Sequence, residues 1–126
     1  MSETCLRFVH ASDFQLDLPL AGIAQIPSHL LDLLVDAPLQ AAANVFQAVL
    51  DQEADFLVLA GDLVSADRCG PREVLFLVEQ FEKLAQRQIP VYWMTGPHDP
   101  DRHWTAASLL PDNVVRLWPD DAPPQG

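Results

Sequence analysis

The sequence FLVLAGD at residues 56–62 decides the fold of this chain. A continuous apolar run of this length, bounded by Asp55 and Gly61, is typical of a strand buried on both faces, as in a parallel sheet. The run ends at Asp62, so the strand delivers a carboxylate at its C-terminal tip. In open α/β sheets, ligands bind just beyond the carboxyl ends of the strands. We therefore expect Asp62 to lie where the chemistry takes place.

Two further stretches have the same layout, an apolar strand followed by polar residues. LRFVH at residues 6–10 leads into ASDFQ at 11–15, and IPVYWM at 89–94 leads into TGPHD at 95–99. If the three strands are parallel neighbours, their polar ends meet at one edge of one sheet. The candidate residues at that edge are Asp13, Asp62, His98 and Asp99.

The segment between the first two strands is long. Residues 16–36 contain several helix breakers, which predicts a covering loop that includes a short helix over 28–35. Asp36 is a good N-cap for a separate helix entered through Pro38. Apolar residues then recur at helical spacing and form one packing face, made of Leu39, Ala42, Ala43, Phe46, Val49 and Leu50.

The second half of the chain continues the alternation of strands and helices. Pro71 begins a helix at a position that proline tolerates well, a short helix is possible over 104–110, and a fourth strand is expected over 114–118. This order predicts an α/β fold with right-handed crossovers, in which a mostly parallel β-sheet is layered with helices.

Length and composition indicate one small globular domain. With 126 residues, 49% of them hydrophobic and 20% charged, the chain is long enough to bury a hydrophobic core that needs no disulfide bonds or structural metal for stability. We expect the domain to span residues 1–118, because residues 119–126 are typical of a disordered tail. Cys5 and Cys69 lack zinc-type spacing and suit a reducing compartment. Since the start lacks the layout of a secretory signal and no apolar run is of membrane-spanning length, a cytoplasmic location is predicted.

The chain is strongly acidic. It has 7 Lys and Arg against 18 Asp and Glu, which gives a net charge of −11. Such a surface repels a polyanion, and the sequence has no basic stripe of the kind that grips a phosphate backbone. Contact with DNA is therefore expected to need bound cations or a partner subunit.

The polar strand ends resemble the motifs of one enzyme superfamily. FVHASDFQLD at residues 8–17 resembles the Asp-x-His motif of the calcineurin-like metallophosphoesterases, and LAGDL at 59–63 resembles their Gly-Asp motif. IPV at 89–91, leading to GPHDP at 96–100, resembles the strand that ends in Gly-Asn-His-Asp. The three pieces occur in order, each after a predicted strand, and within the superfamily they are most similar to DNA-repair exonucleases of the SbcD/YhaO type.

This resemblance implies a metal-dependent phosphoesterase with two divalent cations, for which Mn²⁺ is the expected metal. Asp13 would correspond to a ligand of the first metal and Asp62 to the carboxylate that bridges both. His98 would correspond to the histidine that contacts the scissile phosphate and protonates the leaving group. Asp99 would be the acidic partner that orients this histidine.

The sequence also departs from the family pattern. Gln15 stands where the family has the histidine of Asp-x-His, so a neutral amide oxygen replaces an imidazole ligand. Pro97 stands where the family has an asparagine and offers no side-chain ligand. The family draws further histidines from downstream strands, for which His29 and His103 are poor substitutes. With Asp13 and Asp62 as the main ligands and Gln15 as an optional one, we expect loose cation binding.

Two functions remain open. The first is a metal-dependent phosphodiesterase or DNA exonuclease with residual activity, and the second is a non-catalytic assembly or regulatory subunit that keeps the fold. A flavodoxin-like small-molecule binder is disfavoured because no glycine-rich phosphate loop follows any strand. A complete family member packs a second sheet against the first. We therefore expect one apolar face of this sheet to be covered by a second copy of the chain or by another domain.

Overall fold

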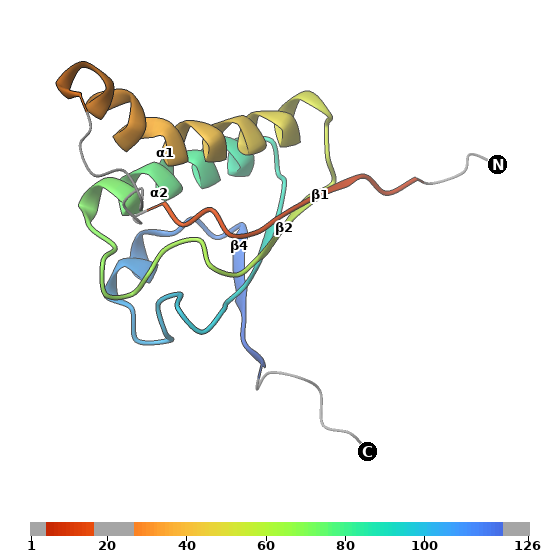
Figure 1. Cartoon of the computed structure of the whole chain (residues 1–126). Helices are drawn as coiled ribbons and strands as arrows, with labels where there is room; N and C mark the ends of the chain where they lie inside the picture. Colours follow the sequence, from red (N-terminus) through yellow and green to blue (C-terminus); the bar gives the residue numbers. More distant parts are fainter. Residues whose placement is uncertain (1–4, 17–26, 120–126) are drawn as a thin grey trace.

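A four-stranded parallel sheet forms the base of the molecule (Figure 1). The computed structural model describes residues 5–16 and 27–119. The strands lie side by side in chain order, with each strand parallel to the next, and are β1 (Phe8–Ala11), β2 (Phe56–Ala60), β3 (Val91–Met94) and β4 (Val114–Leu117). The predicted α/β fold with a parallel sheet is confirmed. Residues 120–126 of the tail predicted at 119–126, and residues 17–26 of the covering loop predicted at 16–36, fall outside the described residues.

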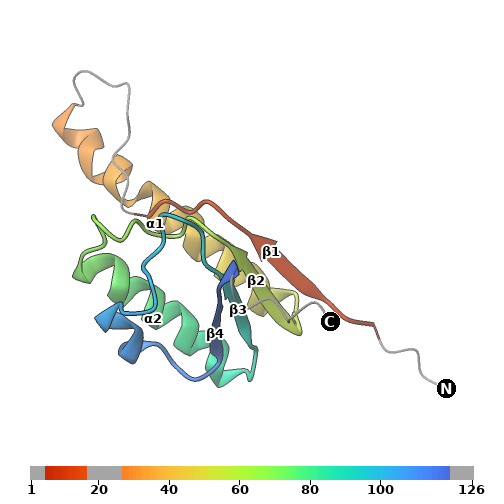
Figure 2. The ribbon, with the colours of Figure 1, turned by 90° about the horizontal axis from the view of Figure 1, so that it is seen from below.

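Both long helices cover the same face of the sheet (Figures 1 and 2). They are α1 (Ser28–Asp51) and α2 (Pro71–Gln86), which also contact each other. Right-handed crossovers between strands that follow one another in the sheet always place the helices on one side. The core between the two layers is made mainly of Ala42, Phe46, Val49, Leu57, Leu59, Leu77, Phe81, Leu84, Val91 and Trp93.

The prediction that the central strand is buried on both faces is wrong. Leu57 and Leu59 point into the core and are fully buried, whereas Phe56 and Val58 are only half-buried. The second face lacks a covering layer within the described residues, because both helices lie on the first. We call this face, made of Phe8, Phe56, Val58, Tyr92, Met94, Val115 and Leu117, the open sheet face.

The prediction of two separate helices before β2 is also wrong, because α1 runs without interruption through Pro38. Proline in a helix interior removes one backbone hydrogen bond, at a cost of about 3 kcal/mol. Asp36 therefore does not cap the start of a new helix; its carboxylate accepts a hydrogen bond from the Arg72 guanidinium of α2. This pair and the packing of the following apolar stripe favour one continuous helix. Within that stripe, Ala42, Phe46 and Val49 are buried as predicted.

The remaining elements follow the sequence expectations. α2 begins at Pro71, and the Gly70 amide before it donates a 3.1 Å hydrogen bond to the Glu73 carboxylate. A 3-10 helix, η1, spans Thr105–Leu109, and β4 follows it. In the part of the chain that the structure describes, no helix combines the length and the hydrophobicity needed to cross a membrane.

Candidate functional site at the carboxyl edge of the sheet

Backbone hydrogen bonds join the end of β1 to the end of β2. The amide of Asp13 donates to the Gly61 carbonyl, and that of Gln15 donates to the Asp62 carbonyl, both at 3.0 Å. Asp13, Gln15 and Asp62 all have a positive φ, of 58°, 47° and 56°. Such values are uncommon for residues other than glycine and often occur at functional sites, where the surroundings hold the strained backbone. Gln15 is thereby held next to Asp62.

A close approach of two glycines joins the end of β2 to the end of β3. A Cβ atom built on Gly61 would lie 3.4 Å from the Cα of Gly96. Beyond these glycines, the Ala66 amide donates a 2.9 Å hydrogen bond to the His98 carbonyl. The loop that carries His98 therefore lies against the loop that follows Asp62.

Asp99 lies beneath this edge and is 6% exposed. One carboxylate oxygen accepts hydrogen bonds from the amides of Gly96 at 2.7 Å and Asp62 at 2.8 Å. The other accepts from the amides of Leu63 at 2.9 Å and Val64 at 3.3 Å. These bonds connect the Asp99 carboxylate to backbone amides of both loops, whereas the family resemblance had implied an orienting contact with His98.

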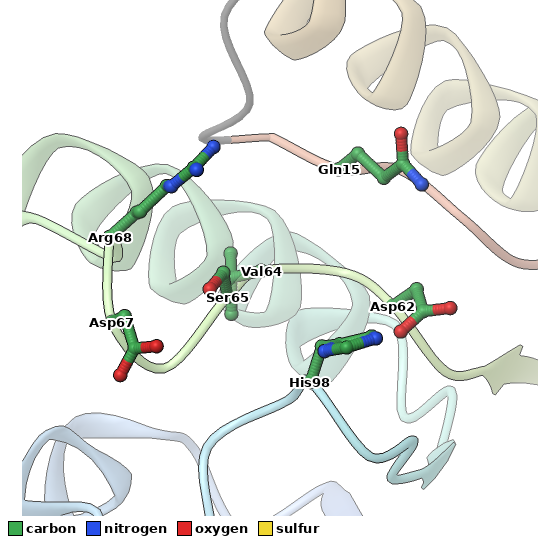
Figure 3. A pocket seen from close by; sticks show the side chains of 7 residues that line it. All are labelled: Gln15, Asp62, Val64, Ser65, Asp67, Arg68 and His98. Atoms are coloured by element: carbon green, nitrogen blue, oxygen red, sulfur yellow. The ribbon is translucent and has the colours of Figure 1, made fainter.

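A cavity of about 420 Å³ opens at this edge (Figure 3). In the figure, the His98 ring extends toward Asp62, Gln15 approaches from the β1 side, and Arg68 lies at the other end. The residues that line the cavity are Gln15, Asp62, Val64, Ser65, Asp67, Arg68 and His98.

The predicted site residues are thus partly brought together. Gln15, Asp62 and His98 line the cavity, and Asp99 lies behind it in contact with the Asp62 amide. Asp13 is exposed, accepts a 2.9 Å hydrogen bond from the Ser12 hydroxyl and is not among the residues lining the cavity.

Ser65, Asp67 and Arg68 also line the cavity but were not predicted as site residues. The sequence predicts only a loop at these residues, between β2 and the proline that begins α2. Their position after the end of a strand could have identified them as site residues. Loops that follow the carboxyl ends of parallel strands are the usual place for binding residues.

The donor atoms at this edge do not make a complete metal centre. No group of three His, Cys, Asp or Glu side chains that could hold a metal ion is present among residues 5–16 and 27–119. Asp62 is nevertheless suited to a cation, because its Oδ1 atom is buried without a hydrogen-bond partner. An unpaired buried carboxylate oxygen is costly unless a donor or a cation satisfies it. The edge offers one such oxygen, with the Gln15 amide and the His98 imidazole at the same cavity.

Arg116 of β4 holds the segment that follows His98. Its guanidinium donates to the carbonyl of Pro100 and, at 3.3 Å, to that of Asp101. Burial lowers the pKa of Arg116, and the charges of Asp99 and Asp101 oppose this change. Through these hydrogen bonds, Arg116 fixes the loop on the side away from β2.

Three tryptophans surround this arginine. The guanidinium carbon of Arg116 lies 4.8, 5.4 and 4.6 Å from the ring centres of Trp93, Trp104 and Trp118. Trp93 is fully buried, and Trp104 packs against the same core. Trp93 is therefore a core residue and not part of a surface on which bases could stack.

Comparison with known proteins identifies the family. A model of the calcineurin-like phosphoesterases matches residues 6–124. The chain belongs to this family. It is similar to YhaO of Bacillus subtilis (strain 168), described as an uncharacterized metallophosphoesterase, with 34% identity over 112 residues. The match covers 88% of this chain and 27% of YhaO, so this calcineurin-like phosphoesterase domain spans about a quarter of the length of that relative.

Proposed function

We propose that this domain is a non-catalytic member of the phosphoesterase family that keeps the fold and a weak cation site at the edge of the sheet. Its role would be that of an assembly or regulatory subunit in a complex related to DNA-repair exonucleases. The observation that carries the proposal is the donor set of the cavity. Asp62 contributes a carboxylate, but Gln15 offers a neutral amide where the family resemblance expects a histidine. A site of this kind competes poorly with water for a divalent cation.

Pro97 supports the same proposal. It occupies the position at which the resemblance expects an asparagine ligand, and proline has no side-chain donor for a metal. Pro97 is also exposed, next to His98, on the loop that extends from β3. Two expected metal ligands are thus replaced, one after β1 and one after β3. A single additional ligand would not restore both.

A metal-dependent phosphodiesterase is the second candidate, and the arrangement of Asp62 and His98 favours it. The His98 ring extends toward Asp62 across the cavity, and the Oδ1 atom of Asp62 is buried without a partner (Figure 3). In this alternative Asp62, with Asp13 and Gln15, would hold a divalent cation such as Mn²⁺, which polarises a phosphoryl oxygen and activates water. His98 would hold the proton for the leaving oxygen, next to the bound phosphate.

The partners we propose follow from charge and from the open sheet face. A net charge of −11 opposes direct binding of DNA, so DNA would be reached through a partner subunit or through bound cations.

The open sheet face exposes Phe8, Tyr92 and Met94 by 58%, 36% and 49%. A second copy of the chain or another domain would cover this face. The cytoplasmic setting that we propose is supported by the low cysteine content, two in 126 residues, which suits a reducing compartment.

Hydrolysis of bis(4-nitrophenyl) phosphate in the presence of Mn²⁺ tests the proposal. We expect the parent protein to turn over this diester no faster than Asp62→Ala does. Asp112→Ala is the control, because it also removes one carboxylate, but an exposed one in the turn before β4, at the opposite end of the strands. Turnover that rises with Mn²⁺ in the parent and in Asp112→Ala, and vanishes in Asp62→Ala, would reject the non-catalytic role in favour of the enzyme.

A further inference from the structure

The Asp99 carboxylate is buried at the point where the loops after β2 and β3 meet. An ionised carboxylate loses its hydration when it is buried, and this is tolerated only where other groups replace the lost water. Here four backbone amides do so, at distances between 2.7 and 3.3 Å. Three of the four belong to consecutive residues, Asp62, Leu63 and Val64. The carboxylate therefore acts mainly on the backbone of the β2 loop.

The hydrogen bonds of Asp99 bear directly on the conformation of Asp62. Asp62 has a φ of 56°, a left-handed conformation that is unfavourable for residues other than glycine. Such a conformation persists only when the surroundings determine it. The Asp62 amide lies on one side of its Cα and the Leu63 amide on the other, and both donate to Asp99. Together they fix the peptide planes on both sides of Asp62.

The consequence of this backbone geometry is the direction of the Asp62 side chain. It lines the cavity opposite the ring of His98, and its Oδ1 atom has no hydrogen-bond partner of its own (Figure 3). A Cβ on Gly96 would lie 3.3 Å from this oxygen, so the side chain has little room on that side. The side chain is therefore directed by the backbone rather than by its own contacts.

We propose that Asp99 is a positioning residue for Asp62. It acts through the amides of the β2 loop, holding Asp62 in the left-handed conformation that presents its carboxylate to the cavity. In this role Asp99 serves Asp62 and not the ring of His98. The proposal rests on the cavity being the functional site, but it does not depend on whether the site binds metal or turns over a substrate.

NMR spectroscopy of the isotope-labelled protein tests this role. In the parent protein, scalar couplings across hydrogen bonds should connect the amide nitrogens of Asp62, Leu63 and Val64 with the carboxylate carbon of Asp99. Asp62 should also show the strong intraresidue cross-peak between amide and Hα protons that marks a positive φ. In Asp99→Asn, we expect both signals to be lost while the helical signals of α2 persist. Asp101→Asn is the matched control, because the Asp101 carboxylate accepts only the nearby His103 amide at 2.8 Å among its described bonds.

The outcomes distinguish a positioning role from a purely stabilising one. If Asp99→Asn folds with a lower stability and the Asp62 cross-peak is unchanged, the proposal is overturned. Absence of the couplings in the parent would overturn it as well. Should Asp99→Asn not fold, the same signals are read in Asp99→Glu, which keeps the charge but moves the carboxylate by one methylene group. Loss of either signal without the other in that variant would again contradict the proposal, whereas couplings and a cross-peak that persist or weaken together would support it. Failure of the non-catalytic proposal would be seen in turnover and would leave these signals untouched.

Discussion

Gly61 and Gly96 meet where β2 and β3 end, so closely that a Cβ on Gly61 would lie 3.4 Å from the Cα and the nitrogen of Gly96. Gly61 also has a φ of 88°, which side chains other than glycine adopt only with strain. This contact brings the loop of Asp62 against the loop of His98. The edge of the sheet thus depends on one position where backbone approaches backbone.

Gly61→Ala should lower the free energy of unfolding by about 1–2 kcal/mol, because a left-handed conformation is costly for alanine. Urea unfolding followed by circular dichroism measures the change. Gly70→Ala is the matched control. The φ of Gly70 is −101°, and the nearest atom to a new Cβ is the flexible Glu73 carboxylate at 3.3 Å. Equal losses in the two variants would show that the strain at Gly61 is unimportant.

Arg116→Met should lower the free energy of unfolding by roughly 2–3 kcal/mol, because hydrogen bonds from a charged donor to the carbonyls of Pro100 and Asp101 are lost. Methionine retains part of the packing against the tryptophans, so the loss reports mainly the charge and its donors. Tryptophan fluorescence should change as well, since the guanidinium contacts three indole rings. Arg87→Met, at the exposed residue that follows α2, should change stability by less than about 0.5 kcal/mol. A loss at Arg116 as small as that at Arg87 would contradict this assignment.

The open sheet face should make the protein self-associate or bind a hydrophobic dye. Tyr92 and Val115 lie beside each other in the sheet and are 36% and 42% exposed. We expect the double variant Tyr92→Lys/Val115→Lys to reduce association in light scattering and to lower the fluorescence of the dye ANS. Leu75→Lys is the control, because Leu75 is 63% exposed but lies on α2. A parent protein that is a monodisperse monomer and does not bind the dye would be evidence against an interface here.

Much of the fold followed from local patterns in the sequence. The apolar run of β2, the helical stripe around Phe46 and the proline at the start of α2 each depend on near neighbours along the chain. The meeting of Asp62 and His98 at one edge followed from assuming that the strands are parallel neighbours, which the structure shows. The spacing of apolar residues thus predicts the strands and helices, and the order of the strands predicts which loops meet.

What the sequence could not show depends on contacts between distant segments. α1 continues through Pro38 in the presence of a pair between Asp36 and Arg72, residues that are 36 positions apart. The hydrogen bonds of Asp99 to the β2 loop span a similar separation. Nothing in the local pattern of GPHD at 96–99 indicates whether its acid faces a histidine or a set of amides.

Calorimetric titration with Mn²⁺ tests the central claim most directly, namely that this edge is a phosphoesterase cation site weakened at Gln15 and Pro97. The proteins compared are the parent, Asp62→Ala and the double variant Gln15→His/Pro97→Asn. We predict weak binding by the parent, no binding by Asp62→Ala, and affinity roughly tenfold or more higher in the double variant, because it restores the two ligands that the family resemblance implies at these positions. Equal affinity of the double variant and the parent would contradict the account.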